Sequence, residues 1–232
     1  MSIEIKRSVK PVDYNVAIQL LEKRLENVIN KSEKELIWFL EHNEIYTAGT
    51  SSNTNDIIDK TIKVIKTSRG GKITHHSHGQ LICYFAIDLS KRNKDIRKFI
   101  ISIENSIIET FSEFNIYTKS DRKNIGIWVN HDNESKKIGA IGIRVKKRVT
   151  KHGLAVNISN NLDLFSQFTP CGIKGCEVSS LEAITGNTIS LGEISHKFIS
   201  FSQNPSSLPA ATYARSNAAE PNLLIPAVDF KI

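Results

Sequence analysis

The sequence has few of the features that mark secreted, membrane-spanning or disulfide-built proteins. It contains three cysteines, Cys83, Cys171 and Cys176, and this odd number argues against a disulfide framework. No apolar run approaches the ~20 residues that span a bilayer, and residues 1–10 alternate charged and apolar side chains without a signal-peptide core. We therefore expect a cytoplasmic protein with reduced thiols and no membrane partner.

Aromatic residues are also scarce, at 7%, and no basic cluster is interleaved with them. This pattern disfavours nucleic acid as a partner. The formal net charge is nevertheless +7, which favours acidic partners. The cations are scattered except for one run, which we expect to be a docking surface: Arg144, Lys146, Lys147, Arg148 and Lys151.

The 232 residues, of which 40% are hydrophobic, are enough for one domain with a sizeable core. The composition changes near the end of the chain. All 12 glycines lie at or before Gly192, whereas four of the six prolines follow residue 204. We expect one catalytic domain over residues 1–200 and a weakly structured extension over residues 201–232.

Hydrophobic periodicity predicts an α+β domain. Apolar side chains at helical spacing predict helices over 13–30, with Asp13 as N-cap, and over 94–113. Short apolar or alternating runs predict strands at 36–40, 62–65, 81–89, 125–129, 141–145 and 154–158. Because the strands are joined by turns more than by helical crossovers, we expect a mixed sheet with helices packed on one side.

The candidate nucleophile is Cys171, which lies between Pro170 and Gly172 and is therefore expected on a turn. A thiol there is accessible, and the N–H groups of such a turn can point at a developing oxyanion. A free thiol has a pKa of ~8.5 and needs a cationic neighbour to react at neutral pH. The alternatives are a small core residue or an oxidation-sensitive surface thiol, and Cys176 is interpreted as incidental.

Lys137 is the candidate for that cation. It precedes the small residues Gly139, Ala140 and Gly142, which allow a substrate or another segment to approach the backbone closely. Its ammonium would stabilise a thiolate, and its amine could accept a proton. The alternative for any single lysine is a solvated surface side chain.

A third segment, Arg-Gly-Gly-Lys-Ile-Thr-His-His at 69–76, has paired glycines that permit close contact with a ligand. It lacks the spacing of a P-loop, and the alternative is a plain turn before a strand. The histidines His75, His76 and His78 have no partner at the spacing of a zinc site, so no metal and no cofactor is expected.

In this order, the segments resemble the lipoyl(octanoyl) transferase family, octanoyl-[acyl-carrier-protein]:protein N-octanoyltransferases of the biotin/lipoate ligase superfamily. The resemblance covers roughly residues 10–195. Its motifs are Glu41-His42 through Gly49, RGGKITHH at 69–76 with Gly79-Gln80-Leu81 and Tyr84, KIGAIGIRV at 137–145, HGLAVNI at 152–158, Asp163 and Phe165, and PCGI at 170–173 with Ser180-Leu181.

The resemblance implies a fold of the biotin/lipoate-ligase catalytic type. It also implies octanoyl transfer from acyl carrier protein to a lysine of the lipoyl domains of 2-oxoacid dehydrogenase and glycine cleavage proteins. Cys171 matches the acyl-thioester nucleophile and Lys137 the lysine that lowers the thiol pKa. The implied substrate-binding residues are Arg69, Gly70, Gly71, Lys72, Ile73, Thr74, His75, His76, Ala140, Ile141, Gly142, Gly153, Leu154 and Ala155.

The chain departs from the family at Ser77-His78, where the usual residues are Gly-Pro, and this loop is adjacent to the implied ligand site. Two alternatives share the fold: an ATP-dependent lipoate-protein ligase, which needs no nucleophilic cysteine, and a catalytically impaired binding protein that keeps the pocket. A nucleic-acid binder, suggested by charge alone, is the third.

Overall fold

The computed structural model describes residues 3–92, 95–202 and 222–228. Its centre is an eight-stranded mixed sheet in the order β13-β1-β2-β6-β12-β9-β8-β7, in which β1 and β2 are parallel and the other neighbours are antiparallel. The strands are β1 (Ile3–Ser8), β2 (Glu35–Leu40), β6 (Gln80–Ala86), β7 (Thr118–Ser120), β8 (Ile127–His131), β9 (Glu134–Ile141), β12 (Gly153–Asn157) and β13 (Asn222–Val228).

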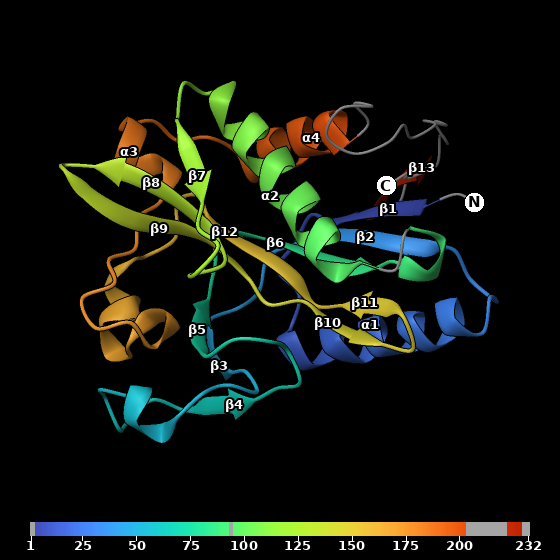
Figure 1. Ribbon diagram of the computed structural model, residues 1–232, viewed down its shortest axis with the longest axis horizontal. Helices are drawn as coiled ribbons and strands as arrows, with labels where there is room; N and C mark the ends of the chain where they lie inside the picture. Colours follow the sequence, from blue (N-terminus) through green and yellow to red (C-terminus); the bar gives the residue numbers. More distant parts are fainter. Residues whose placement is uncertain (1–2, 93–94, 203–221, 229–232) are drawn as a thin grey trace.

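Helices cover both faces of this sheet (Figure 1). Helix α1 (Tyr14–Ile29) lies on one face, and α2 (Ile96–Ser112) and α4 (Leu191–Ser202) lie on the other. The expectation that helices pack on one side only is therefore wrong. The reason is visible in β2 and β6, where every residue is buried and only the first is polar: such strands need cover on both faces.

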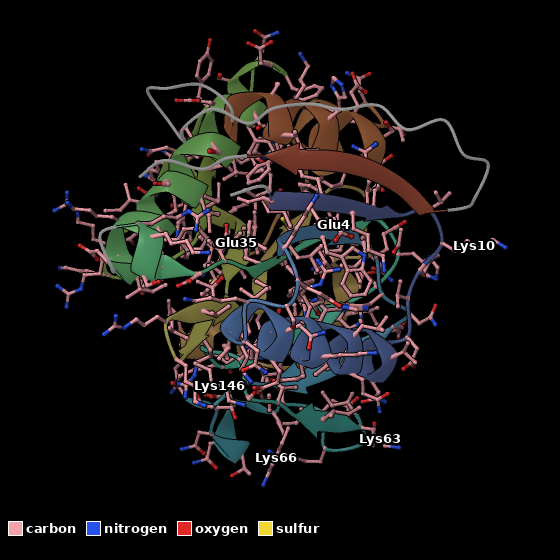
Figure 2. All side chains as sticks on the ribbon, turned by 90° about the vertical axis from the view of Figure 1, so that its right-hand side faces the viewer. Glu4, Lys10, Glu35, Lys63, Lys66 and Lys146 are labelled. Carbon is pink, nitrogen blue, oxygen red and sulfur yellow. The ribbon has the colours of Figure 1, made fainter. Side chains whose placement is uncertain are left out.

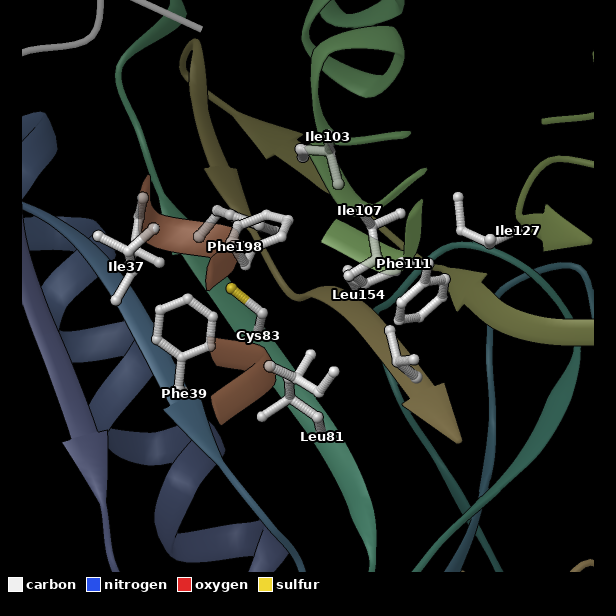
Figure 3. Close-up of a cluster of buried hydrophobic side chains, with 14 of the residues drawn as sticks. Ile37, Phe39, Leu81, Cys83, Ile103, Ile107, Phe111, Ile127, Leu154 and Phe198 are labelled. Carbon is white, nitrogen blue, oxygen red and sulfur yellow. The ribbon is translucent and has the colours of Figure 1, made fainter. Parts of the chain in front are cut away.

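The two faces of the strands build two separate cores. Phe39, Cys83 and Leu154 pack with α2 and α4, and Figure 3 shows Cys83 between Phe198 and Phe39. The alternate residues of the same strands pack with α1: Leu36, Trp38, Leu40, Ile82, Tyr84 and Ala86. The period-two alternation of a strand thus divides one apolar run between two cores.

The long helices begin at the predicted places. The carboxylate of Asp13 accepts a hydrogen bond from the N–H of Val16 at 3.1 Å, which confirms it as the N-cap of α1. Asp95 caps α2 in the same way. One predicted strand, 141–145, is divided: β9 ends at Ile141 and β10 (Arg144–Lys146) forms a separate hairpin with β11 (Val149–Lys151).

A second, three-stranded sheet lies on the same side of the large sheet as α1 in Figure 1. It contains β4 (Val64–Lys66), β3 (Ile45–Ala48) and β5 (Ile73–His76). Figure 2 shows Lys66 of β4, and Lys63 just before this strand, at the edge of the molecule. Short 3-10 helices and one short α-helix complete the described fold: η1 (Thr54–Asp56), η2 (Leu89–Lys91), η3 (Asp163–Gln167), η4 (Pro170–Gly172) and α3 (Leu181–Thr185).

The end of the chain differs in part from the expected extension. Helix α4 runs to Ser202, and β13 pairs with β1 in an antiparallel register. Residues 203–221 and 229–232, which belong to the predicted extension, lie outside the described residues. Within the described part of the chain, no helix is both long enough and apolar enough to cross a membrane.

Candidate active site

A cavity of about 340 Å³ opens between the large sheet, the small sheet and the segment that carries Cys171. Its size is within the ~300–1,000 Å³ range of small-ligand pockets. It brings together Cys171, Lys137 and the three segments that the sequence singles out. The predicted residues that line it are Arg69, Gly70, Gly71, Lys72, Ile73, Thr74, His76, Ala140, Ile141, Gly142, Gly153, Leu154 and Ala155.

Cys171 lies on the expected turn, at the middle of η4, with a left-handed φ of 57°. Gly172, which follows it, is also left-handed, at 63°. Two N–H groups of this turn are already used: Gly172 donates to the carbonyl of Thr169 at 3.0 Å, and Ile173 donates to Pro170 at 3.1 Å. These two N–H groups are therefore occupied within the turn itself.

Lys137 is buried, with 6% of its surface exposed, and its ammonium reaches the thiol. Nζ donates to Sγ of Cys171 at 3.0 Å and to the carbonyl of Ile125 at 2.8 Å. It also lies 5.1 Å above the ring of Trp128. A lysine held by a carbonyl, an aromatic face and a thiol is not a solvated surface side chain, so that alternative is wrong for Lys137.

The missing side chain of Gly126 explains how Lys137 reaches this position. A Cβ at Gly126 would lie 2.4 Å from Cε and 2.8 Å from Nζ of Lys137, and the φ of 143° is itself typical of glycine. Gly126 therefore leaves the channel through which the lysine side chain runs. Sequence reasoning missed this residue, because an isolated glycine before a strand gives no sign of a distant side chain.

The surroundings of Cys171 favour its thiolate. The Cys176 thiol donates a hydrogen bond to the Cys171 sulfur, and Lys137 adds its charge and its own hydrogen bond. Together they lower the pKa of Cys171 to about 6, although burial acts in the opposite direction. The same shared proton raises the pKa of Cys176. The interpretation of Cys176 as incidental is therefore wrong.

A second lysine lies against the nucleophile turn. A Cβ at Gly172 would be 1.9 Å from Nζ of Lys72, so the absent side chain makes room for that ammonium. Nζ of Lys72 also forms an ion pair with Asp56 at 3.5 Å. The carbonyl of Asp56 accepts from the N–H of Thr169 at 2.7 Å. Asp56, which holds the ammonium of Lys72, is therefore itself bonded to the residue that precedes η4.

Arg69 holds the loop of the 69–76 segment in place. Its guanidinium is buried and donates to the carbonyl and the hydroxyl of Thr47 at 2.6 and 2.9 Å. The N–H of Gly70 donates to the carbonyl of Gly142 at 3.1 Å, and a Cβ on either glycine would contact the other segment's backbone. Gly70 and Gly142 thus allow the 69–76 segment to pack closely against the end of β9.

Small residues form the floor of the cavity, and polar aromatic groups form its inner wall. Ala140 pairs with Ala155 across β9 and β12, both of which line the cavity. Burial lowers the pKa of His152 to about 3 and raises that of Tyr84, so both side chains are neutral near pH 7. The floor and wall can therefore accept an uncharged chain.

His75 does not line the cavity, unlike the other members of its segment. It is fully buried between Tyr46 and Phe165, with ring centroids at 4.6 and 5.9 Å. His75 and His76 alternate on β5, so their side chains point to opposite sides. The resemblance assigned both histidines to substrate binding, and the structure brings only His76 to the cavity.

The altered loop at Ser77-His78 lies outside the lining of the cavity. Ser77 is buried and His78 is exposed, and neither lines the cavity. The position that needs a left-handed conformation is Gly79, with a φ of 78°, and it is retained. Its N–H donates to the carboxylate of Glu41 at 2.7 Å.

The basic run 144–151 forms the hairpin β10–β11, and two of its cations are used inside the molecule. Lys146, seen beside α1 in Figure 2, pairs with Glu26, and Lys151 pairs with Glu22. At the tip, Lys147 and Arg148 are exposed and form no ion pair within the described part of the chain. Lys147 and Arg148 are therefore available to an acidic partner, as is the exposed Arg144, whose guanidinium donates a hydrogen bond to the hydroxyl of Thr50 at 3.3 Å.

Sequence reasoning also missed several wall residues. Tyr14 lies within the predicted helix 13–30 and Tyr84 belongs to a motif of the resemblance, but neither is predicted to line a site. Alternation along β6 places Gln80, Ile82 and Tyr84 on one face, and this signal could have identified them. Within residues 3–92, 95–202 and 222–228, no group of three His, Cys, Asp or Glu side chains could hold a metal.

Comparison with solved structures confirms the fold that the resemblance implied. A bipartite lipoate protein ligase from Thermoplasma acidophilum superposes with a TM-score of 0.67 at 13% identity, over 87% of this chain and 82% of that chain. A lipoate-protein ligase A bound with ATP superposes with a TM-score of 0.66 at 13% identity, over 94% and 90%. At these identities the likeness concerns the fold alone.

Comparison with known sequences is more specific. An octanoyltransferase from Anaplasma phagocytophilum (strain HZ) is 44% identical over 79% of this chain and 89% of its own length. One from Wolbachia pipientis wMel is 42% identical over 79% and 89%. The model of the lipoyl protein ligase A/B catalytic domain matches residues 13–201. The chain therefore belongs to the lipoyl protein ligase A/B catalytic domain family and, within it, to the transferase enzymes of the octanoyltransferase group.

Proposed function

We propose that the enzyme transfers an octanoyl group from octanoyl-acyl carrier protein to a lysine of lipoyl domains through a thioester on Cys171. The observation that carries this proposal is the 3.0 Å contact between Nζ of Lys137 and Sγ of Cys171 at a cavity of about 340 Å³. A thiolate beside an ammonium is the arrangement that nucleophilic catalysis by cysteine requires.

In the first step, the Cys171 thiolate attacks the carbonyl carbon of the donor thioester. The bond to the donor sulfur breaks, and that sulfur leaves as a thiolate, which takes a proton from the Lys137 ammonium. The products are an acyl-Cys171 thioester, a free donor thiol and a neutral lysine amine. Because one thioester replaces another, the step is nearly thermoneutral and needs no ATP.

In the second step, the amine of the acceptor lysine attacks the acyl-Cys171 carbonyl. The neutral Lys137 takes the proton that this amine must lose, and Cys171 leaves as a thiolate. Lys137 is then an ammonium again, 3.0 Å from the thiolate as at the start. Formation of an amide from a thioester is downhill and drives the overall reaction.

The acyl chain would extend from Cys171 over the small-residue floor, along Ala140, Gly142, Gly153 and Ala155, toward Tyr84. The walls named above, from Arg69 to Thr74 with His76, would enclose it. The floor supplies apolar surface, and His152 and Tyr84 add neutral polar atoms, which suits a saturated chain. The two cations of the wall have partners of their own, Thr47 for Arg69 and Asp56 for Lys72. No cofactor takes part in either step.

Both partner proteins would be acidic. The net charge of +7 and the exposed cations Lys147 and Arg148 would speed their encounter with this surface. Lys123, which lines the cavity, lies where an incoming donor would pass. The carrier protein would deliver its thioester to Cys171, and a lipoyl domain would then deliver its lysine to the same opening.

Intact-mass measurement tests this function. After incubation with octanoyl-acyl carrier protein, the wild-type enzyme should gain one octanoyl group, which hydroxylamine removes, and Cys171→Ala should gain none. Addition of a lipoyl domain should transfer the group to that domain without ATP. Octanoylation or lipoylation that requires ATP and survives Cys171→Ala would instead establish a ligase, and an acyl-enzyme that never transfers would establish an impaired binding protein.

A further inference from the structure

The loop that carries the nucleophile holds a second thiol. Cys171 and Cys176 are separated by four residues, of which Gly172 and Gly175 are both left-handed, with φ of 63° and 72°. The N–H of Cys176 donates to the carbonyl of Ile173 at 3.1 Å, which closes a turn. Two left-handed glycines and a closed turn fold the chain back on itself, so the two cysteines approach each other.

Lys137 anchors both ends of this loop. Its Nζ contacts Sγ of Cys171 at 3.0 Å, while its backbone N–H donates to the carbonyl of Glu177 at 2.8 Å. Its carbonyl accepts from the N–H of Ser179 at 2.9 Å. Cys176 directly precedes Glu177, and its Sγ donates to the carbonyl of Glu177 at 3.8 Å. The Cys176 thiol therefore lies at the end of the loop that Lys137 anchors, near enough to Cys171 for each thiol to affect the protonation of the other.

The three cysteines differ in access to solvent. Cys83 is 1% exposed and lies among apolar side chains between β6 and the helices, whereas Cys171 and Cys176 are both partly exposed. Cys176 lines a second hollow that shares Pro170 and Ile173 with the main cavity. A small oxidant can thus reach both thiols of the loop but not Cys83.

We propose that the Cys171–Cys176 pair is an oxidation site for hydroperoxides, at which Cys176 traps oxidised Cys171 as a reversible disulfide. Thiolates beside a cation are the cysteines that peroxides oxidise. A neighbouring thiol then decides between a reversible and an irreversible product. The chemistry needs only the loop itself; its consequence, reversible loss of acyl transfer, rests on the proposed function.

The two steps balance. The Cys171 thiolate attacks one peroxide oxygen, the O–O bond breaks, and the departing oxygen takes a proton and leaves as water or an alcohol. Cys171 is now a sulfenic acid, and the peroxide is reduced. The sulfur of Cys176 then attacks that of Cys171, the S–O bond breaks, and the hydroxide leaves as water with the proton of Cys176.

The experiment exposes the full-length enzyme to limiting hydrogen peroxide, removes the excess with catalase, and alkylates the remaining thiols. Trypsin can cut after Lys174, between the two cysteines, so their peptides stay joined only if a disulfide links them. The wild type should lose two hydrogen atoms and two of its three alkylatable thiols. Dithiothreitol should restore both thiols.

Cys176→Ser is the matched variant, because serine keeps a hydrogen-bond donor but cannot form a disulfide. Alkylation of its Cys171 before oxidation checks that the loop is intact. Under peroxide it should gain oxygen at Cys171, up to a sulfinic acid that dithiothreitol does not reverse. Equal oxygen gain in the wild type, with no joined peptides, or a disulfide to Cys83 would overturn the proposal. Because the readout is mass, this outcome is independent of acyl transfer.

Discussion

The ammonium of Lys137 donates a hydrogen bond of 3.0 Å to Sγ of Cys171, from a buried position that Gly126 leaves open. The two residues come from separate elements, β9 and η4, and are held in register because Lys137 also pairs through its backbone with Glu177 and Ser179. The contact therefore depends on these backbone hydrogen bonds of β9 as well as on the two side chains. The effect of the Lys137 ammonium on Cys171 should be measurable as thiol reactivity.

The first prediction concerns the pH dependence of that reactivity. Cys171 has a pKa of about 6, so its alkylation rate in the wild type should rise with pH and reach half its maximum near pH 6. Lys137→Met removes the ammonium and should shift this midpoint upward by about 1–2 pH units. Iodoacetamide kinetics followed by peptide mapping measure it.

Lys136→Met is the control for that variant, because it removes the same charge from the adjacent residue, whose ammonium pairs with Glu177 at 3.1 Å and not with the thiol. Its midpoint should stay close to that of the wild type. Equal shifts in the two variants would mean that the effect of Lys137 is general charge and not the specific contact.

A second prediction follows from the position of Lys72 against Gly172. Because the N–H groups of Gly172 and Ile173 are already used, we expect the ammonium at this place to stabilise an oxyanion formed beside Cys171. Lys72→Met should lower the rate of acyl-Cys171 formation by roughly 10²–10³-fold, as expected for loss of one oxyanion donor. Quenched-flow mass spectrometry or stopped-flow fluorescence measures the rate of acyl-Cys171 formation.

Lys174→Met serves as the comparison for Lys72→Met, because Lys174 belongs to the same loop but lines only the second hollow. It should leave acyl-enzyme formation within a few-fold of the wild type. If Lys72→Met instead moves the pH midpoint of Cys171 alkylation as far as Lys137→Met does, Lys72 acts on the thiol and not on the oxyanion.

The sequence was sufficient for features that depend on local pattern. Apolar periodicity predicted α1 with its N-cap at Asp13, and the fully apolar run of β2 predicted a buried strand; both are confirmed. The turn at Cys171 followed from its proline and glycine neighbours and is also confirmed. The resemblance supplied the fold and the family, which composition alone could not distinguish from other α+β domains.

Contacts between distant segments could not be predicted in this way. Gly126 and Lys137 are eleven residues apart, and Lys72 and Gly172 a hundred, so no local pattern joins them. Cys176 is interpreted as incidental from the sequence because a disulfide is disfavoured in a reducing cell, and the four residues between the cysteines do not indicate how the loop folds back. The helices on both faces were missed because the prediction considered only how the strands are connected, although the continuous apolar run in β2 indicates cover on both faces.

The third prediction is an acid instability that depends on His75. Burial lowers its pKa to about 4, against ~6.5 in the unfolded chain, so protonation favours the unfolded state. Its contribution is fully present above about pH 6.5 and is lost as the pH falls toward 4. In urea unfolding, the loss of stability from pH 7 to pH 5 should be smaller in His75→Phe than in the wild type, by about 1–2 kcal/mol.

Phenylalanine suits this site because Tyr46 and Phe165 already pack against the ring. His78→Gln, at an exposed position of the same region, provides the control and should lose as much stability on acidification as the wild type. If His75→Phe and the wild type lose the same free energy between the two pH values, His75 does not titrate as its burial predicts.

The last prediction tests the floor of the cavity. Ala140 lines it, opposite Ala155, and Leu at this position adds three carbon atoms to a surface that the acyl chain would cover. Ala140→Leu should shorten the longest accepted chain by about three carbons and lower kcat/KM for octanoyl donors by roughly 10–200-fold per obstructed contact. Donors with four or five carbons should react at rates close to the wild type, so the preference for eight-carbon over short donors inverts.

Ala183→Leu, at an exposed position of α3, is the control and should leave that preference unchanged. A uniform fall for all chain lengths in Ala140→Leu would show that β9 had shifted, whereas an unchanged profile would place the acyl chain elsewhere than along Ala140 and Ala155.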